Sequence, residues 1–140
     1  MRRILFDVNV VLDVLLDRKP HAEASSAAWA AVESGRCEGF IAAHAVTAIH
    51  YLLAKELGAT GAKRAIGAIL RVFRVAAVDE AVIQEAMRLS LTDFEDGVTA
   101  AAAQESDCAY LLTRDPKGFR GSPVRHIAPE ALTALLGQID

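Results

Sequence analysis

An apolar run that ends in a carboxylate is the feature that most constrains the fold of this chain. Residues Ile4–Phe6 are followed by Asp7, and apolar side chains over Val10–Leu15 then recur at helical spacing. The run predicts a buried strand, and the spacing after it predicts a helix that packs back on that strand. Asp7 would lie at the carboxyl end of the strand, where ligand crevices form in open parallel sheets. Asp7 is therefore either a functional group or, like Asn9, a cap of the next helix.

The length and charge of the chain narrow the possible classes of protein. A chain of 140 residues is long enough to bury its own core, and we expect one domain over residues 1–140. Its content of 53% hydrophobic and 24% charged residues is typical of a globular protein and not of a disordered one. The net charge of −3 gives no general attraction to nucleic acid or acidic membranes. A polyanionic partner must be held by a local basic patch or through bound cations.

The cysteines and the apolar segments bear on location. Cys37 and Cys108 lie far apart and form no CxxC or Cys/His metal pattern, so we expect buried thiols in a reducing compartment. The basic start resembles a signal peptide, but Asp7 and Asp13 interrupt its apolar part. The most apolar run, residues 39–54, is shorter than the roughly 20 residues that span a bilayer. We therefore expect a cytoplasmic protein that does not associate with membranes.

Strand and helix patterns alternate along the chain. This alternation predicts an α/β fold, a three-layer α/β/α sandwich with a central, mainly parallel sheet. Beyond the first strand and helix, the expected strands are Cys37–Ala42, Phe73–Val78, Cys108–Thr113 and Val124–Ile127. The expected helices are Ala22–Glu33, Ala45–Leu57 up to Gly58, Thr60–Leu70, a helix from Asp79 to about Leu89, a helix from about Thr92 to Ser106, and Pro129–Leu136.

Three acidic residues occupy comparable places in this arrangement. Asp7 and Asp115 follow the first and fourth strands, and Asp96 lies in the first turns of the helix before the fourth strand. If they meet at one sheet edge, their repulsion raises their pKa values, and a divalent cation relieves it. An all-oxygen site favours Mg²⁺ or Mn²⁺. The alternatives are that Asp96 belongs to a capping sequence and that Asp115 serves the turn Asp-Pro-Lys-Gly.

Four segments resemble, in order, the four motifs of PIN-domain (PilT N-terminus) nucleases: Ile4–Leu12, Val46–Leu52, Asp93–Asp96 and Leu111–Asp115. The resemblance covers almost the whole chain and is greatest to the VapC-like toxins of toxin–antitoxin pairs, which are Mg²⁺-dependent endoribonucleases. It implies that Asp7, Asp96 and Asp115 are catalytic and bind the metal, with Asn9 and Thr113 as polar neighbours of the first and last acids. It also implies a homodimer and a cognate antitoxin.

The second motif departs from the family pattern. His50 stands where that family usually has an acid. A histidine there would ligate Mn²⁺, contact phosphate when protonated, or simply fill the helix face. The loss of one negative charge should weaken Mg²⁺ binding, and Asp93 or Glu95 would partly compensate.

An acidic site needs basic neighbours to hold an RNA backbone. Arg114 and Lys117 beside the fourth motif are the candidates for RNA binding. The other basic residues expected to flank the site are Arg18, Lys19, Arg120 and Arg125. The alternative for each of them is an ordinary solvated surface charge.

Two other functions compete with a metal-dependent ribonuclease. One is a phosphatase of the haloacid dehalogenase type with Asp7 as nucleophile, although Asn9 replaces the second aspartate of that family. The other is a catalytically weakened PIN-like module that binds RNA or an antitoxin. Apolar side chains of the early helices would form a dimer or antitoxin surface or, alternatively, the core: Trp29, Val32, Ile49 and Leu53.

Overall fold

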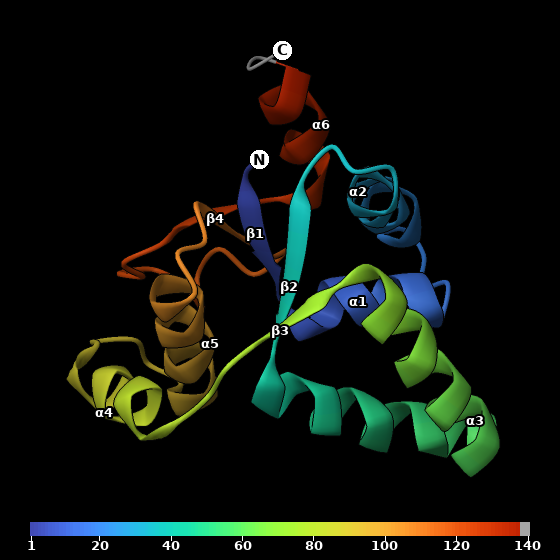
Figure 1. Cartoon of the computed structure of the whole chain (residues 1–140), viewed down its shortest axis with the longest axis horizontal. Coiled ribbons are helices and arrows are strands. Elements are labelled where there is room, and N and C mark those ends of the chain that lie inside the picture. The colour runs from blue at the N-terminus through green and yellow to red at the C-terminus, as the bar shows by residue number, and fades with distance from the viewer. Residues whose placement is uncertain (138–140) are drawn as a thin grey trace.

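Five parallel strands form one sheet, which helices cover on both faces (Figure 1). The structure is a computed structural model and describes residues 1–137. The elements in chain order are β1 (Arg3–Phe6), α1 (Val8–Leu15), α2 (Ala22–Glu33), β2 (Glu38–Ala42), α3 (Ala43–Val72), β3 (Arg74–Ala76), α4 (Glu80–Arg88), α5 (Phe94–Glu105), β4 (Tyr110–Leu112), β5 (Arg125–Ile127) and α6 (Pro129–Gly137). The predicted α/β/α architecture is confirmed, and every strand pairing is parallel.

The order of the strands singles out the carboxyl ends of β1 and β4. The strand order is β3-β2-β1-β4-β5. After β1 the chain adds β2 and β3 on one side of it, and then adds β4 and β5 on the other side. Helices α1, α2 and α3 pack together on one face, whereas α4 and α5 pack together on the other (Figure 1). The direction of winding therefore reverses between β1 and β4. In sheets of this kind ligands bind at the carboxyl ends of the strands that flank the reversal.

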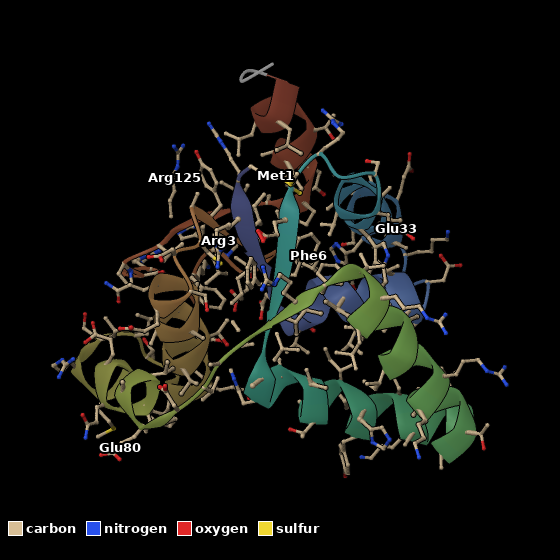
Figure 2. All side chains as sticks on the ribbon, in the orientation of Figure 1. Met1, Arg3, Phe6, Glu33, Glu80 and Arg125 are labelled. Atoms are coloured by element: carbon tan, nitrogen blue, oxygen red, sulfur yellow. The ribbon has the colours of Figure 1, made fainter. Side chains whose placement is uncertain are left out.

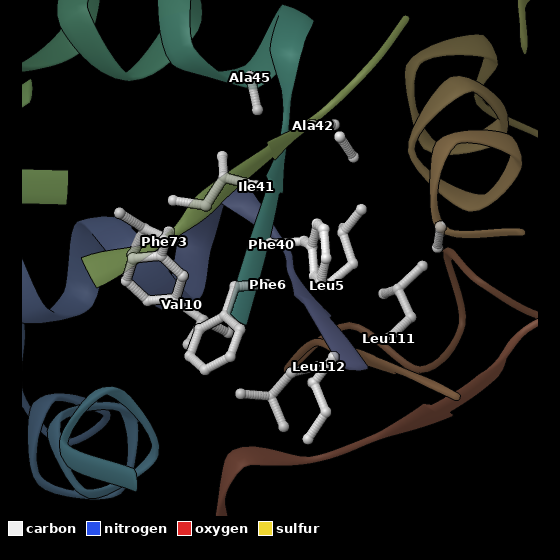
Figure 3. Close-up of a cluster of buried hydrophobic side chains, with 14 of the residues drawn as sticks. Leu5, Phe6, Val10, Phe40, Ile41, Ala42, Ala45, Phe73, Leu111 and Leu112 are labelled. Carbon is white, nitrogen blue, oxygen red and sulfur yellow. The ribbon is translucent and has the colours of Figure 1, made fainter. Parts of the chain in front are cut away.

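The central position of β1 explains its continuous apolar sequence. Ile4 and Leu5 are fully buried and Phe6 is 1% exposed. Because side chains alternate across a strand, Leu5 and Phe6 lie on opposite sides of the sheet (Figure 3). On one side the rings of Phe6 and Trp29 each pack edge to face on Phe73, with centroids 4.9 Å apart in both pairs. This aromatic cluster joins the first strand, the second helix and the end of α3.

The apolar residues considered for a dimer or antitoxin surface belong to the core. Ile49 and Leu53 are fully buried, and Trp29 and Val32 are each 8% exposed. The alternative of a free interaction surface is therefore wrong for these four side chains. Tyr51, Leu52 and Leu57, on the same half of α3, are exposed. The packing of α3 on α1 determines which side of the helix is covered.

Helix α3 consists of two helical segments. Gly58 has φ 76° and ψ 171°, and the backbone on either side of it is helical. Glycine adopts this conformation without the steric cost that other residues incur. The predicted break at Gly58 is confirmed, whereas the first segment begins at Ala43, two residues before its predicted start. Ala42 precedes it with an extended backbone and without a side-chain cap, so the sequence there carries no capping signal.

Both thiols lie inside the protein, as predicted. Burial raises the pKa of Cys37 to about 11 and that of Cys108 to about 12, so both thiols are protonated at neutral pH. Within residues 1–137 no helix combines the length and the apolar character that crossing a bilayer requires.

Gly39 tests how tightly the aromatic cluster is packed. A Cβ atom at this position would lie 2.6 and 2.7 Å from ring carbons of Phe73 and 2.9 Å from Cγ1 of Val32. We expect Gly39→Ala to lower the free energy of unfolding by about 1–3 kcal/mol, measured by urea denaturation, because the core cannot accept the extra atom without shifting. Gly67→Ala is the control: its Cβ meets open space within α3, and it should stabilise by up to about 1 kcal/mol. Equal midpoints for Gly39→Ala and wild type would contradict tight packing here.

Candidate functional site

Asp7 lies at the junction of β1 and α1 and has two roles in the structure. Its backbone is extended, its amide donates to the carbonyl of Leu112 over 2.9 Å, and its Oδ1 accepts a 2.8 Å hydrogen bond from the amide of Val8. Its Oδ2 accepts a 2.8 Å hydrogen bond from the hydroxyl of Thr113. Asp7 therefore caps α1, as one interpretation of the sequence held, and also places a carboxylate where β1 and β4 end side by side.

Thr113 connects the first acid to the last. Its hydroxyl is buried, donates to Asp7 and accepts a 3.0 Å hydrogen bond from the amide of Asp115. Asp115 is exposed, and its Oδ1 accepts a 3.2 Å hydrogen bond from the amide of Gly118. This bond confirms the predicted turn. The parallel pairing of Phe6 with Leu112 brings the two strand ends side by side, as the sequence predicted.

Asp96 enters the site from the start of α5. Asp93 is the N-cap of this helix, and its Oδ1 accepts a 3.0 Å hydrogen bond from the amide of Asp96. The side chain of Asp96 is left free of capping and turns toward Asp115. A Cβ atom built on Gly118 would lie 2.9 Å from Oδ2 of Asp96 and 2.5 Å from Oδ2 of Asp115. The two carboxylates thus approach one point, and a glycine leaves room for them.

The proximity of the carboxylates changes their proton affinity. Burial and then the negative charges of Asp7, Asp93, Asp115 and Glu95 raise the pKa of Asp96 to about 7. Burial raises the pKa of Asp7 above its usual value, and Asp115 and Glu95 add to the effect, while the bonds from Thr113 and Val8 oppose it. Carboxyl groups with pKa values raised in this way cluster at sites that bind cations or perform chemistry.

The donor set fits a hard divalent cation. Asp7, Asp96 and Asp115 supply carboxylate oxygens only, the ligands that Mg²⁺ and Mn²⁺ prefer. Oδ2 of Asp96 and Oδ2 of Asp115 face the same space at Gly118, and the repulsion among the acids would be relieved by a positive charge. In the described part of the chain, no three His, Cys, Asp or Glu side chains are already arranged as a closed ligand cluster. The residue types therefore fit a divalent cation, whereas the side chains of the described residues are not already arranged as a closed set of metal ligands.

His44 is a neighbour of the site that sequence reasoning missed. It lies in the first turn of α3, directly beyond the carboxyl end of β2, and its Nε2 is 3.3 Å from Oγ1 of Thr99 on α5. Burial lowers its pKa below the usual value, while the charge of Glu95 acts in the opposite direction. Its Nδ1 is buried and finds no hydrogen-bond partner among residues 1–137. The rule that drew attention to Asp7, a polar residue just after a central strand, would also have identified His44.

The predicted auxiliary residues occupy different surroundings. Asn9 is exposed, and its Oδ1 accepts a 3.3 Å hydrogen bond from Arg18. His50 lies two turns along α3 from its start and is exposed. Their functional roles stay predictions.

The basic residues do not form one patch. Lys117 is exposed, whereas the guanidinium of Arg114 is engaged by Asp13, with Nε 2.8 Å from Oδ2. Arg125 pairs with Tyr110 at the end of the sheet where the strands begin, and it lies on the side of Arg3, away from Phe6 (Figure 2). The expectation that Arg125 flanks the carboxylates is therefore wrong. RNA contacts by Arg114 and Lys117 stay predictions.

Comparisons with known proteins agree with the fold. A family model described as "PIN domain" matches residues 3–117. A solved structure of FitAB bound to a DNA fragment is 24% identical, with a TM-score of 0.73 over 91% of this chain and 95% of that one. A toxin–antitoxin complex from Klebsiella pneumoniae is 19% identical, with a TM-score of 0.67 over 90% and 97%. VapC20 from Mycobacterium tuberculosis, described as a sarcin-ricin loop cleaving toxin, is 18% identical, with a TM-score of 0.61 over 77% and 86%. No curated protein matches the sequence.

The raised pKa of Asp96 makes the stability of the metal-free protein depend on pH. Its carboxyl has a pKa of about 7 in the folded chain against the ordinary aspartate value of 3.8, so the folded state binds more protons between these two pH values. The contribution of this carboxyl to the free energy of unfolding is therefore complete at low pH and is lost as the pH rises toward 7. Asp96→Asn removes this loss. At pH 8 in EDTA we expect the variant to be more stable by on the order of 1 kcal/mol, less than the full linkage value because solvent screens the group.

Thermal melting at pH 4 and pH 8 measures this effect. The two proteins should melt close together at pH 4, where the wild-type carboxyl is protonated, and diverge at pH 8. A difference of the same size at both pH values would mean that the substitution acts through packing and not through repulsion among the acids.

Proposed function

The chain belongs to the PIN-domain family, and from this premise we propose that it is a divalent-metal-dependent endoribonuclease that hydrolyses RNA phosphodiester bonds. The observation that supports this most is the meeting of Asp7, Asp96 and Asp115 at the point where the winding of the sheet reverses. These three side chains would hold Mg²⁺ or Mn²⁺ and are the proposed catalytic residues. Such a cation, when bound, polarises a phosphoryl oxygen and lowers the pKa of an attacking water.

The chain's own residues would prepare this site. Thr113 fixes the orientation of the Asp7 carboxylate through its 2.8 Å hydrogen bond, so that carboxylate needs little reorganisation when it binds a ligand. Asp93 takes over the capping of α5, which leaves the side chain of Asp96 available. Asp96 would release its proton when a cation binds, because its pKa lies near 7. Lys117, exposed on the same loop as Asp115, is the proposed contact to the RNA backbone.

We further propose that the protein is the toxin of a toxin–antitoxin pair, acts in the cytoplasm and forms a homodimer. The structural neighbours support the first part, because one of them is described as a toxin–antitoxin complex. The exposed side chains of Tyr51, Leu52 and Leu57 on α3 provide apolar surface that a protein partner would cover. We expect light scattering on the purified protein to give twice the 15.0 kDa chain mass. A mass of one chain at every concentration would contradict the dimer.

One alternative function keeps some support. In a weakened PIN-like module that only binds RNA or an antitoxin, the acids would never close around a cation, and no closed ligand cluster is present among residues 1–137. His50, in place of an acid, fits the same idea. The family assignment leaves the haloacid dehalogenase alternative without support.

Cleavage of a mixed single-stranded and structured RNA pool with Mg²⁺, Mn²⁺ or EDTA tests the proposal. We expect metal-dependent cleavage that falls by about 100-fold or more in Asp7→Asn and in Asp96→Asn, because ligand loss costs at least as much as loss of a supporting contact. Asp107→Asn is the matched control. It is the same change at an acid that lies beside Cys108 and has a positive φ, which asparagine tolerates.

The outcomes separate the nuclease from the binding module. Cleavage that survives in both site variants would exclude the carboxylate mechanism. If the wild type is inert with every metal but His50→Glu restores cleavage, the weakened module is correct. Inertness of both proteins would reject nuclease activity altogether.

A further inference from the structure

Asp13 is a buried charge that the proposed chemistry does not use. It lies in α1, its side chain is fully buried, and it accepts hydrogen bonds from three side chains on three different segments. Nε of Arg18 is 2.9 Å from Oδ1, and Oγ of Ser25 on α2 is 3.2 Å from Oδ2. Arg114 binds it with two nitrogens, Nε at 2.8 Å from Oδ2 and Nη2 at 3.2 Å from Oδ1. A buried carboxylate with this many donors is held in one orientation.

The Arg114 contact matters because of where Arg114 lies in the chain. The preceding residue, Thr113, donates to Asp7 at the start of α1, and the following residue is Asp115. The loop after β4 is therefore attached to α1 at two points by consecutive side chains. One attachment is the hydroxyl bond to Asp7, and the other is the two-pronged bond to Asp13. Asp115, the next residue, is exposed and can therefore reach solvent and a ligand.

We propose that Asp13 is a positioning residue: by gripping the guanidinium of Arg114 it fixes the backbone that carries Asp115 next to Asp7. This inference rests on the proposed metal-dependent function, because Asp115 is a ligand only under that function. It also separates Arg114 from Lys117, which the sequence had grouped as RNA contacts. The planar fork of Arg114 is committed to a carboxylate, and 30% of its side chain is exposed. Lys117 has no such partner in the bonds and ion pairs of residues 1–137 and is exposed.

The two possible roles of Arg114 predict opposite results for a conservative change. Arg114→Lys keeps the positive charge but cannot form the two parallel bonds to Asp13. If Arg114 positions Asp115, lysine should fail to rescue metal binding. If Arg114 contacts RNA phosphates, lysine should largely rescue RNA binding, since a phosphate contact depends mainly on charge.

The first measurement is Mn²⁺ binding by the RNA-free protein, followed by electron paramagnetic resonance of the free ion. We expect Arg114→Lys and Arg114→Ala each to weaken binding by about 10 to 100-fold, as loss of a supporting contact does in metal sites. Ser25→Ala is the matched control, because it removes another hydrogen bond to Oδ2 of Asp13 but leaves the loop of Asp115 untouched. It should bind Mn²⁺ within about threefold of wild type, below the range expected for a supporting contact. All proteins are compared at a temperature where melting curves show them folded.

The second measurement is the salt dependence of RNA binding in EDTA. Lys117→Ala should reduce the slope of log affinity against log salt by about 0.7 to 0.9, the value for one lost phosphate contact, whereas Arg114→Ala should leave the slope unchanged. On the wild type, the NMR signal of the Arg114 Nε–H should stay in place when RNA is added. This observation does not depend on any variant folding.

The results distinguish the two levels of the proposal. A wild type that binds no Mn²⁺ would overturn the proposed function and this inference with it. If both Arg114 variants bind Mn²⁺ as tightly as the wild type does, the inference about Asp13 and Arg114 is overturned, while the proposed function stands. A reduced salt slope in Arg114→Ala, together with an Nε–H signal that moves on adding RNA, would assign Arg114 to RNA contact instead.

Discussion

The parallel register of β1 and β4 is the constraint on which the rest of the site depends. Phe6 pairs with Leu112, so the next residue of each strand, Asp7 and Thr113, leaves the sheet at the same level. The amide of Asp7 then continues the ladder to Leu112, and the hydroxyl of Thr113 bonds its carboxylate. A slip of one residue would turn every side chain of β1 to the opposite face and remove this meeting. The continuous burial of β1 on both faces holds the register.

Bringing the carboxylates of Asp7, Asp96 and Asp115 close together costs free energy, which the packing of the core offsets. Raised pKa values at Asp7 and Asp96 mean that the folded chain resists ionising both. The elements that carry them are rigid because they pack deeply: α5 buries a run of alanines against the sheet, and α1 buries its central residues Val10–Asp13. Small side chains let α5 approach closely, which brings Asp96 near the strand ends. The fold thus maintains a repulsive arrangement that a bound cation would relieve.

Much of this could be predicted from the sequence because it depends on local patterns. The bounds of α2 match their prediction, Asp79 caps α4 at the predicted start of that helix, and Gly58 divides α3. Asp7 and Asp115 could be brought together because parallel strands end at one edge. The third acid followed once the amino terminus of α5 was assumed to point toward that edge.

The parts that could not be predicted depend on long-range packing. Arg114 and Asp13 are 101 residues apart, and nothing in the local sequence of either indicates the other. His44 and His50 lie on one apolar segment, and the contact of His44 with Thr99 on α5 depends on how α3 and α5 pack. The use of Trp29 and Leu53 in the core likewise depends on which side of each helix its neighbours cover.

The wide separation of the site residues along the chain also has a consequence for synthesis on the ribosome. The first acid belongs to the first strand, whereas Thr113, Arg114 and Asp115 follow β4, the fourth of the five strands. A nascent chain therefore carries Asp7 through most of its translation without the residues that orient it or complete the site. The carboxylates come together only after β4 has left the ribosomal tunnel and paired with β1. Under the proposed ribonuclease function, this order would keep the growing chain inactive beside the message that encodes it.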